Sequence, residues 1–217
     1  MTRLSSGRSR HGLTMAAAGW LALAAACTSG PPPPENTRDY EQTIQAFRKS
    51  KDEFLRTDQQ SPIALAARAT FAPLPYYPVD PSLHMPAALA EDRSGPPVII
   101  ELPTSKDQKQ QMRRVGTLRF TVAGTEYALT AFAEGETPII NRLFLPFRDT
   151  TSGGETYGGG RYLNLDRTPT GLYDLDFNRA YHPYCVYNYE YECPVPPREN
   201  QLPIAIRAGE RLAHPEK

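Results

Sequence analysis

The sequence lacks the motifs that identify several common enzyme classes. It has no G-x-S-x-G element, no H-E-x-x-H pair and no Asp-rich ligand set, so neither a serine hydrolase nor a metal-dependent hydrolase is indicated. Glycines 158–160 lack both the Lys-Ser/Thr of a phosphate-binding loop and the spacing of a dinucleotide fingerprint, which disfavours a nucleotide cradle. We therefore expect no cofactor. Whether the chain is an enzyme stays open here, because paired carboxylates can perform acid–base hydrolysis.

The chain also lacks an excess of charge of either sign. Its 24 basic residues balance its 24 acidic residues. Because three of the arginines lie in the first 27 residues, the remainder holds 21 basic against 24 acidic residues, a net charge of about −3. No stripe of Lys and Arg is present, so we expect no nucleic-acid partner.

The N-terminal hydrophobic run is too short to cross a bilayer as a stable helix. It spans Met15–Ala26, consists mostly of Ala and Leu, and follows a segment with three arginines and no acidic residue, as in a signal peptide. It ends in Ala24-Ala25-Ala26-Cys27, which resembles a lipobox whose cysteine becomes acylated. The match is imperfect, since Leu23 lies one position before the preferred place for leucine.

We therefore expect residues 1–26 to be a lipoprotein-type signal peptide and Cys27 to be the lipidation site. The protein would then be exported and membrane-anchored through its lipid, facing the periplasm or lying at the cell surface. An ordinary secretory peptide with an incidental Cys27 is the alternative. Residues 27–37 contain four consecutive prolines and are expected to form an extended, Pro-rich tether.

Cysteine is scarce, and only Cys185 and Cys193 remain if Cys27 carries lipid. They are close enough in sequence to close one small loop. In an oxidising compartment we expect them to form a disulfide, with a stabilisation of roughly 2–3 kcal/mol. A zinc site and a pair of free thiols are the alternatives. Zinc needs further ligands, and His182 is the one candidate nearby.

Residues 38–211 are predicted to form a single domain, followed by a flexible tail over 212–217. An amphipathic helix is expected over 38–55, because its apolar residues form one stripe: Tyr40, Ile44, Phe47, Phe54 and Leu55. Residues 63–97 contain seven prolines and are expected to wrap irregularly over the core.

From Val98 onward the sequence is typical of β structure. Alternating apolar residues around Gly124-Thr125 predict a hairpin over 116–133, and "VIIEL", "INRLFLPF", "GRYLNLD", "YDLDF" and "PIAIRAG" are further strand candidates. No helices intervene. The predicted fold class is therefore mainly β (α+β): an antiparallel β-sandwich or small barrel with one N-terminal amphipathic helix and a Pro-rich wrapping segment.

The runs "LPFRDTTSGGETYGGGRYLNLD", "DFNRAYHPYCVYNYEYECPVPPRENQLPIAIRAGE" and "FRKSKDEFLRTDQQSPI" are specific enough to compare with known families. They resemble the uncharacterised bacterial domain-of-unknown-function family 1684. The resemblance covers about residues 38–211 of the chain. It implies little about activity, because the family has no assigned reaction.

Polar and aromatic residues gather between positions 148 and 200. The ligand-binding candidates are Arg148, Asp149, Glu155, Tyr157, Arg161, Tyr162, Asp176, Asn178 and Tyr181. Arginine holds a carboxylate or phosphate through two parallel hydrogen bonds, and aromatic rings cover apolar or sugar-like faces. If the sheet brings these segments together, the region is suited to a small polar or anionic ligand.

Each candidate also has a structural interpretation. Glycines 158–160 fit a turn that needs positive φ before a strand, and Arg148-Asp149 with Arg161 fit a buried ion network equally well. Asp176 and Asn178 are typical turn residues. His182 is expected at the surface rather than as a general base.

Two other functions stay open. One is a carboxylate-dependent hydrolase in which Glu155 pairs with Asp149 or Asp176. The other is an envelope protein-interaction module, whose interface would lie on the tyrosine-rich loop around Cys185 and Cys193.

Overall fold

The computed structural model describes residues 37–92, 95–134 and 140–214. The predicted signal peptide, Cys27 and all of the tether except Thr37 lie outside these residues, as does the end of the predicted tail. Over the described ranges, no helix is long and apolar enough to cross a membrane.

The predicted helix is confirmed as α1 (Thr37–Thr57). Its buried stripe contains Tyr40, Ile44 and Leu55 as predicted, whereas Phe47 and Phe54 are only partly buried. The stripe also contains Arg48, which is only 6% exposed although a charged residue is expected on the outer face. This buried arginine is important for the function proposed below.

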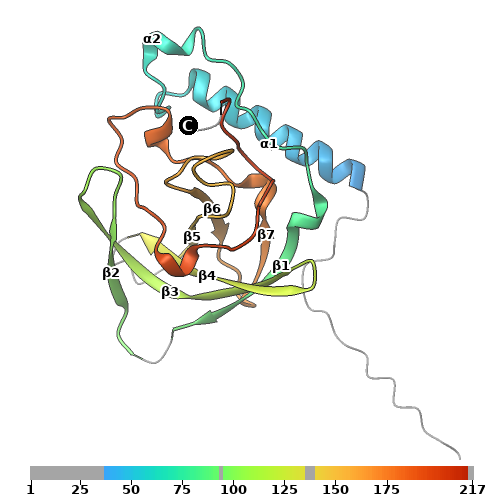
Figure 1. Cartoon of the computed structure of the whole chain (residues 1–217), viewed down its shortest axis with the longest axis vertical. Coiled ribbons are helices and arrows are strands. Elements are labelled where there is room, and N and C mark those ends of the chain that lie inside the picture. The colour runs from blue at the N-terminus through green and yellow to red at the C-terminus, as the bar shows by residue number, and fades with distance from the viewer. Residues whose placement is uncertain (1–36, 93–94, 135–139, 215–217) are drawn as a thin grey trace, which may run out of the picture.

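Seven antiparallel strands form one strongly curved, nearly closed, barrel-like sheet in the described part of the chain, which confirms the predicted mainly β class (Figure 1). The strands are β1 (His84–Glu91), β2 (Val98–Pro103), β3 (Lys109–Val122), β4 (Thr125–Glu134), β5 (Arg142–Phe147), β6 (Arg161–Asp166) and β7 (Leu172–Asp176). Their order is β6-β5-β4-β3-β1-β7, and β2 also pairs with β3.

The predicted hairpin is the β3–β4 pair. Its two turn residues, Ala123 and Gly124, have φ values of 48° and 79°, the left-handed conformation that tight hairpin turns need. β3 begins seven residues earlier than the predicted hairpin and carries a bulge between Arg114 and Gly116. The part of β3 before the bulge pairs with β2, and the part after it pairs with β1.

Two sequence predictions are wrong. Residues 84–91, placed in the irregular Pro-rich segment, form β1 between β3 and β7. Pro86 is tolerated there because β1 pairs with β3 only from Ala88 onward, so no bond to β3 is lost at the proline. Residues 203–209, predicted as a strand, are irregular. Their carbonyl groups are used by an arginine side chain instead, as shown below.

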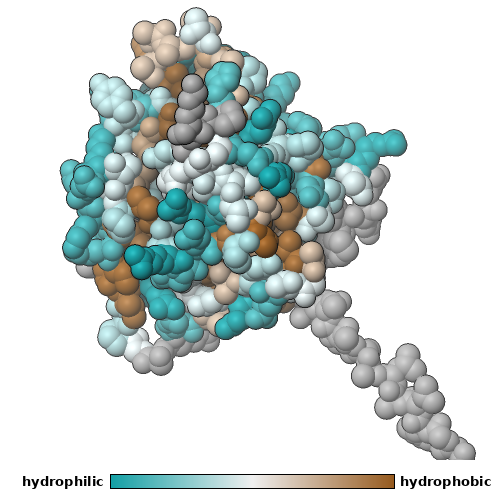
Figure 2. Space-filling model, in the orientation of Figure 1, coloured by the Kyte–Doolittle hydropathy of each residue, from teal (hydrophilic) through white to brown (hydrophobic). Residues whose placement is uncertain are grey.

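The main core fills the inside of the sheet with side chains such as Leu118, Leu129, Leu143 and Phe177. A second cluster of buried residues comprises Leu102, Met112, Phe132, Phe144, Tyr162 and Cys193. The helix α1 crosses over the loop that follows β7 and over the C-terminal segment (Figure 1). The face drawn in Figure 2 is largely hydrophilic, with apolar atoms over β2, where Val98 and Ile99 are exposed.

Candidate functional site

The three glycines form the predicted turn before a strand. The Gly160 N–H donates to the Tyr157 carbonyl at 2.9 Å, and β6 begins at the next residue. Gly160 has a φ of 92°, and a Cβ there would lie 2.5 Å from the Phe147 carbonyl oxygen. The positive φ and the lack of room for a Cβ atom both require glycine at this position. The turn therefore sets the start of β6 and the position of Arg161.

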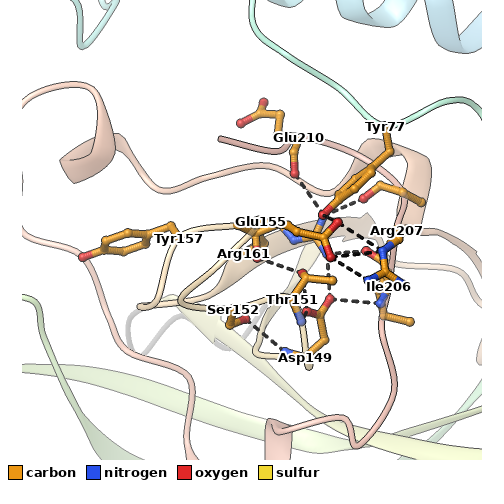
Figure 3. Close-up of polar contacts among 12 residues, drawn as sticks. Tyr77, Asp149, Thr151, Ser152, Glu155, Tyr157, Arg161, Ile206, Arg207 and Glu210 are labelled. Atoms are coloured by element: carbon orange, nitrogen blue, oxygen red, sulfur yellow. Dashed lines mark hydrogen bonds and ion pairs between the residues drawn. The ribbon is translucent and has the colours of Figure 1, made fainter. Parts of the chain in front are cut away.

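Arg161 lies in a buried ion network and is only 1% exposed. Its Nη2 donates to Asp149 Oδ2 at 2.7 Å and to the Ile206 carbonyl at 2.6 Å. Its Nη1 donates to the carbonyl oxygens of Ala208 and Glu210 at 2.5 and 3.1 Å (Figure 3). The guanidinium thus binds the C-terminal segment to the barrel and explains why this segment forms no sheet hydrogen-bond ladder.

Asp149 is used in the same network. Its Oδ1 accepts the Thr151 N–H at 2.7 Å, and its Oδ2 accepts the Ile206 N–H at 3.3 Å in addition to Arg161. These contacts match the ion-network alternative from the sequence. With every one of these groups engaged by the chain itself, a ligand at Arg161 or Asp149 would have to displace a protein contact.

Glu155 lies beside this network but is partly exposed. Arg207 holds both of its oxygens, with Nη2 to Oε1 at 2.6 Å, and the Tyr77 hydroxyl donates to Oε2 at 3.1 Å. The hydrogen bonds from Arg207 lower the pKa of Glu155. A general acid needs a raised pKa, so this direction disfavours Glu155 as the acid of the hydrolase hypothesis, whereas it is compatible with the base of the pair.

Asp176 and Asn178 form a separate network under α1. Asp176 Oδ1 accepts the Tyr40 hydroxyl at 2.8 Å and the Asn178 N–H at 2.9 Å. The Asn178 side chain donates to the Asp80 carbonyl and accepts the Asp80 N–H, both at 2.8 Å. These contacts connect the helix, the segment before β1 and the end of β7.

The remaining predicted residues, three tyrosines and Arg148, make other contacts. Tyr157 extends away from the Asp149–Arg161 network in Figure 3. Tyr162 and Tyr181 pack edge-to-face with ring centroids 5.8 Å apart. Arg148 makes a backbone bridge to Gln201. The structure therefore spreads the predicted residues over several networks rather than one cleft, and ligand binding by them stays a prediction.

His182 is not at the surface, contrary to expectation. It is 2% exposed, and its Nε2 accepts the Tyr157 N–H at 3.3 Å. Burial lowers its pKa to about 4, so the ring is neutral near pH 7. Its backbone N–H donates to Glu210 Oε2 at 2.8 Å.

Glu210 was missed by the sequence analysis. It is 1% exposed, pairs with Lys51 of α1 and accepts the Tyr187 hydroxyl as well as the His182 N–H. Its position near the end of a Pro-rich tail gave no signal of burial. The contacts show that the charge of Lys51 is already balanced within the protein.

Arg48, also missed, is a buried residue whose hydrogen-bonding groups are not satisfied. Both its Nε and its Nη2 are buried and have no hydrogen-bond partner among the described residues. Its guanidinium carbon lies 4.5 Å from the centre of the Tyr76 ring, and the Tyr76 hydroxyl is also buried and without a partner. The sequence did contain a signal, since Arg48 lies four residues after Ile44 on the apolar stripe.

Cys185 and Cys193 are adjacent free thiols in the structure. The Cys185 N–H donates to Cys193 Sγ at 3.3 Å. The predicted disulfide is therefore not confirmed and stays a prediction. Over the described ranges, no three His, Cys, Asp or Glu residues gather as a metal site would require.

Two surface pockets lie away from these networks. One, of about 500 Å³, is lined by residues of β1 and of the segment 167–171. The other, of about 430 Å³, lies between residues 61–68 and the tyrosine-rich loop. Neither is lined by a predicted site residue or by Arg48.

Comparison with known proteins identifies relatives without an assigned activity. Residues 69–211 match the family described as "Protein of unknown function (DUF1684)". The solution structure of an uncharacterized protein from Haloarcula marismortui is similar, with a TM-score of 0.62 and 38% sequence identity. That similarity covers 81% of this chain and 96% of the other. No curated protein matches the chain.

Proposed function

The chain belongs to the DUF1684 family of proteins of unknown function, and we propose that it is an exported, lipid-anchored domain that binds a small oxyanion through Arg48. The ligand would be a carboxylate or phosphate, free or as the end group of a larger molecule. The single observation that carries this proposal is the buried and unpaired edge of the Arg48 guanidinium.

A buried charge without a partner is costly. When one partner of a buried ion pair is removed, the charge left behind typically destabilises the protein by about 3–5 kcal/mol. No ion pair joins Arg48 to an acidic residue within the described part of the chain, and burial lowers its pKa. An anion with two oxygens would satisfy both free N–H groups and offset the charge.

The geometry of the free edge indicates the class of ligand. Nε and Nη2 lie on the same side of a guanidinium, the side that meets a carboxylate or phosphate with two parallel bonds. Arg207 uses this edge in the same protein, holding Glu155 through Nε at 3.1 Å and Nη2 at 2.6 Å. Arg148 has an unpaired Nε, but of the described arginines only Arg48 has both atoms buried and free.

The surroundings of Arg48 favour an anion over a cation. Tyr76 stacks against the guanidinium and adds a free hydroxyl that can donate to a ligand oxygen. Lys51, one turn further along α1, adds a second positive charge, although Glu210 balances it.

Calorimetric titration of the mature chain with inorganic phosphate and with acetate tests the proposal. We expect one of the two to bind the unaltered protein and Arg48→Met to lose that binding at least tenfold. Arg207→Met is the matched control, since its guanidinium is already occupied by Glu155, and it should bind as the unaltered protein does. Equal binding by the Arg48 variant, or none by any form, would overturn the proposal.

A different observation favours the envelope-protein alternative. Leu65 and Tyr189 are 81% and 82% exposed on the two segments that border the 430 Å³ pocket. Large exposed apolar and aromatic side chains around a depression are typical of protein interfaces. A photo-reactive residue at position 189 should crosslink to one defined envelope protein in cells, and a smear of unrelated crosslinks would count against this role.

A further inference from the structure

The two thiols lie in unlike surroundings. Cys185 is half-buried in η3 (Tyr184–Val186), whereas Cys193 is 7% exposed and belongs to the second apolar cluster. The Cys185 N–H donates to Cys193 Sγ, which places the two side chains next to each other. Cys185 is therefore the more exposed residue of the pair.

Three donor groups act on the Cys185 sulfur. The Cys193 thiol and the hydroxyl groups of Ser105 and Tyr157 each lower the pKa of Cys185 by hydrogen bonding. Tyr157 comes from the glycine turn and Ser105 from the turn between β2 and β3. These are separate parts of the chain, so the fold as a whole brings them together.

Backbone contacts fix this arrangement. The Ser105 N–H donates to the Cys193 carbonyl at 2.9 Å, and the Cys193 N–H donates to Ser105 Oγ at 3.2 Å. Because its oxygen accepts from Cys193, the Ser105 hydroxyl hydrogen is free to point at Cys185. The Tyr157 N–H donates to His182, which anchors the residue whose ring carries the other hydroxyl.

Together these hydrogen bonds stabilise a Cys185 thiolate. The bond from Cys193 is the largest cause, burial opposes it, and Ser105 and Tyr157 add to it, so that the pKa of Cys185 falls to about 6. The same interaction raises the pKa of Cys193. A disulfide with only a structural role has no need of donors directed at one sulfur, whereas a nucleophilic thiolate does.

We propose that Cys185 and Cys193 form a reactive dithiol that exchanges with low-molecular-weight disulfides, with Cys185 as the attacking thiolate and Cys193 as the resolving thiol. The Cys185 thiolate attacks one sulfur of the small disulfide, forming a mixed disulfide and releasing one small thiolate. Cys193 then loses its proton and attacks Cys185 Sγ, releasing the second small thiol. Two protein thiols are oxidised and one disulfide is reduced.

The first experiment uses the reduced full chain, oxidised glutathione at pH 7 and mass spectrometry with peptide mapping, which also separates Cys27. We expect Cys193→Ser to accumulate glutathione on Cys185, because no resolving thiol remains. Cys185→Ser should stay unmodified at the buried Cys193. The unaltered chain should end with the Cys185–Cys193 bond and no retained glutathione.

The opposite pattern would overturn the proposal: glutathione on Cys193 in Cys185→Ser, or no adduct on Cys185 in Cys193→Ser. It also fails if mixtures of reduced and oxidised glutathione never reopen the bond in the folded, unaltered chain, since the bond is then only structural.

The second experiment measures the rate of Cys185 alkylation by iodoacetamide against pH in the reduced chain. The midpoint should lie near pH 6 and move upward in Ser105→Ala, which removes one donor. Ser82→Ala is the matched control, because Ser82 is exposed and its hydroxyl bonds Asp80 instead. An unshifted midpoint in Ser105→Ala would show that the hydroxyl does not act on the sulfur.

Discussion

Two buried arginines of this protein have opposite surroundings. Arg161, at the start of β6, donates to one carboxylate and three carbonyl oxygens. Arg48, on α1, is buried almost as deeply, yet it contacts an aromatic ring and leaves one whole edge of its guanidinium unpaired. Burial of a charge is therefore no sign of a binding site by itself. What separates the two arginines is whether the protein satisfies the buried donors.

The largest expected effect comes from removing the satisfied arginine. Arg161→Met leaves Asp149 buried without its partner and three carbonyl groups without a donor, which should destabilise the protein by about 3–5 kcal/mol. Urea denaturation followed by circular dichroism measures this loss. A variant as stable as the unaltered chain would show that Arg161 does not hold the C-terminal segment.

His182, which is buried beside Glu210, should produce a loss of stability in acid. Its pKa is about 4 in the folded protein and about 6.5 in the unfolded chain, so between these values only the unfolded chain binds the extra proton. Stability should fall by about 3 kcal/mol as the pH drops from about 6.5 to about 4, with no further loss from this group below that.

Denaturation midpoints over this pH range test the prediction. In His182→Gln the acid loss should shrink, because the amide oxygen can still accept the Tyr157 N–H but does not titrate. An equal acid loss in this variant would assign the effect to another group.

The smallest expected effect comes from the unsatisfied arginine. Arg48→Met replaces an unpaired buried charge by an apolar side chain of similar length, so stability without ligand should change by less than about 1 kcal/mol or increase. The same urea experiment measures both arginine variants. If Arg48→Met is destabilised as strongly as Arg161→Met, the two regions are alike, and Arg48 has a structural role.

Local patterns in the sequence predicted much of the fold. The 3.6-residue spacing of Tyr40 and Ile44 indicated α1, and the alternation around Gly124 indicated the β3–β4 hairpin. The predictions failed where the local structure depends on residues that are distant in the sequence. β1 contains a proline and several alanines, and its strand conformation depends on the pairing with β3 and β7.

The candidate site was predictable only in part. The sequence offered Arg148-Asp149 with Arg161 as an ion network, and Arg161 does bind Asp149. It paired Glu155 with Asp149 or Asp176, whereas Tyr77 and Arg207 hold Glu155. It gave no indication that Arg161 would be satisfied by carbonyl groups 45 to 49 residues further along the chain. The satisfaction of a hydrogen bond depends on every neighbour in space, and residue type does not specify those neighbours.

By itself, then, the sequence determined the mainly β class, the amphipathic helix, the glycine turn before β6 and the family, because each depends on short-range periodicity or on local runs of residues. Only the tertiary structure decided which buried charges are paired. Arg161 and Arg48 are the same residue type and are both removed from water. The difference between them is the presence or absence of acceptors, which segments distant in the chain supply when they pack together.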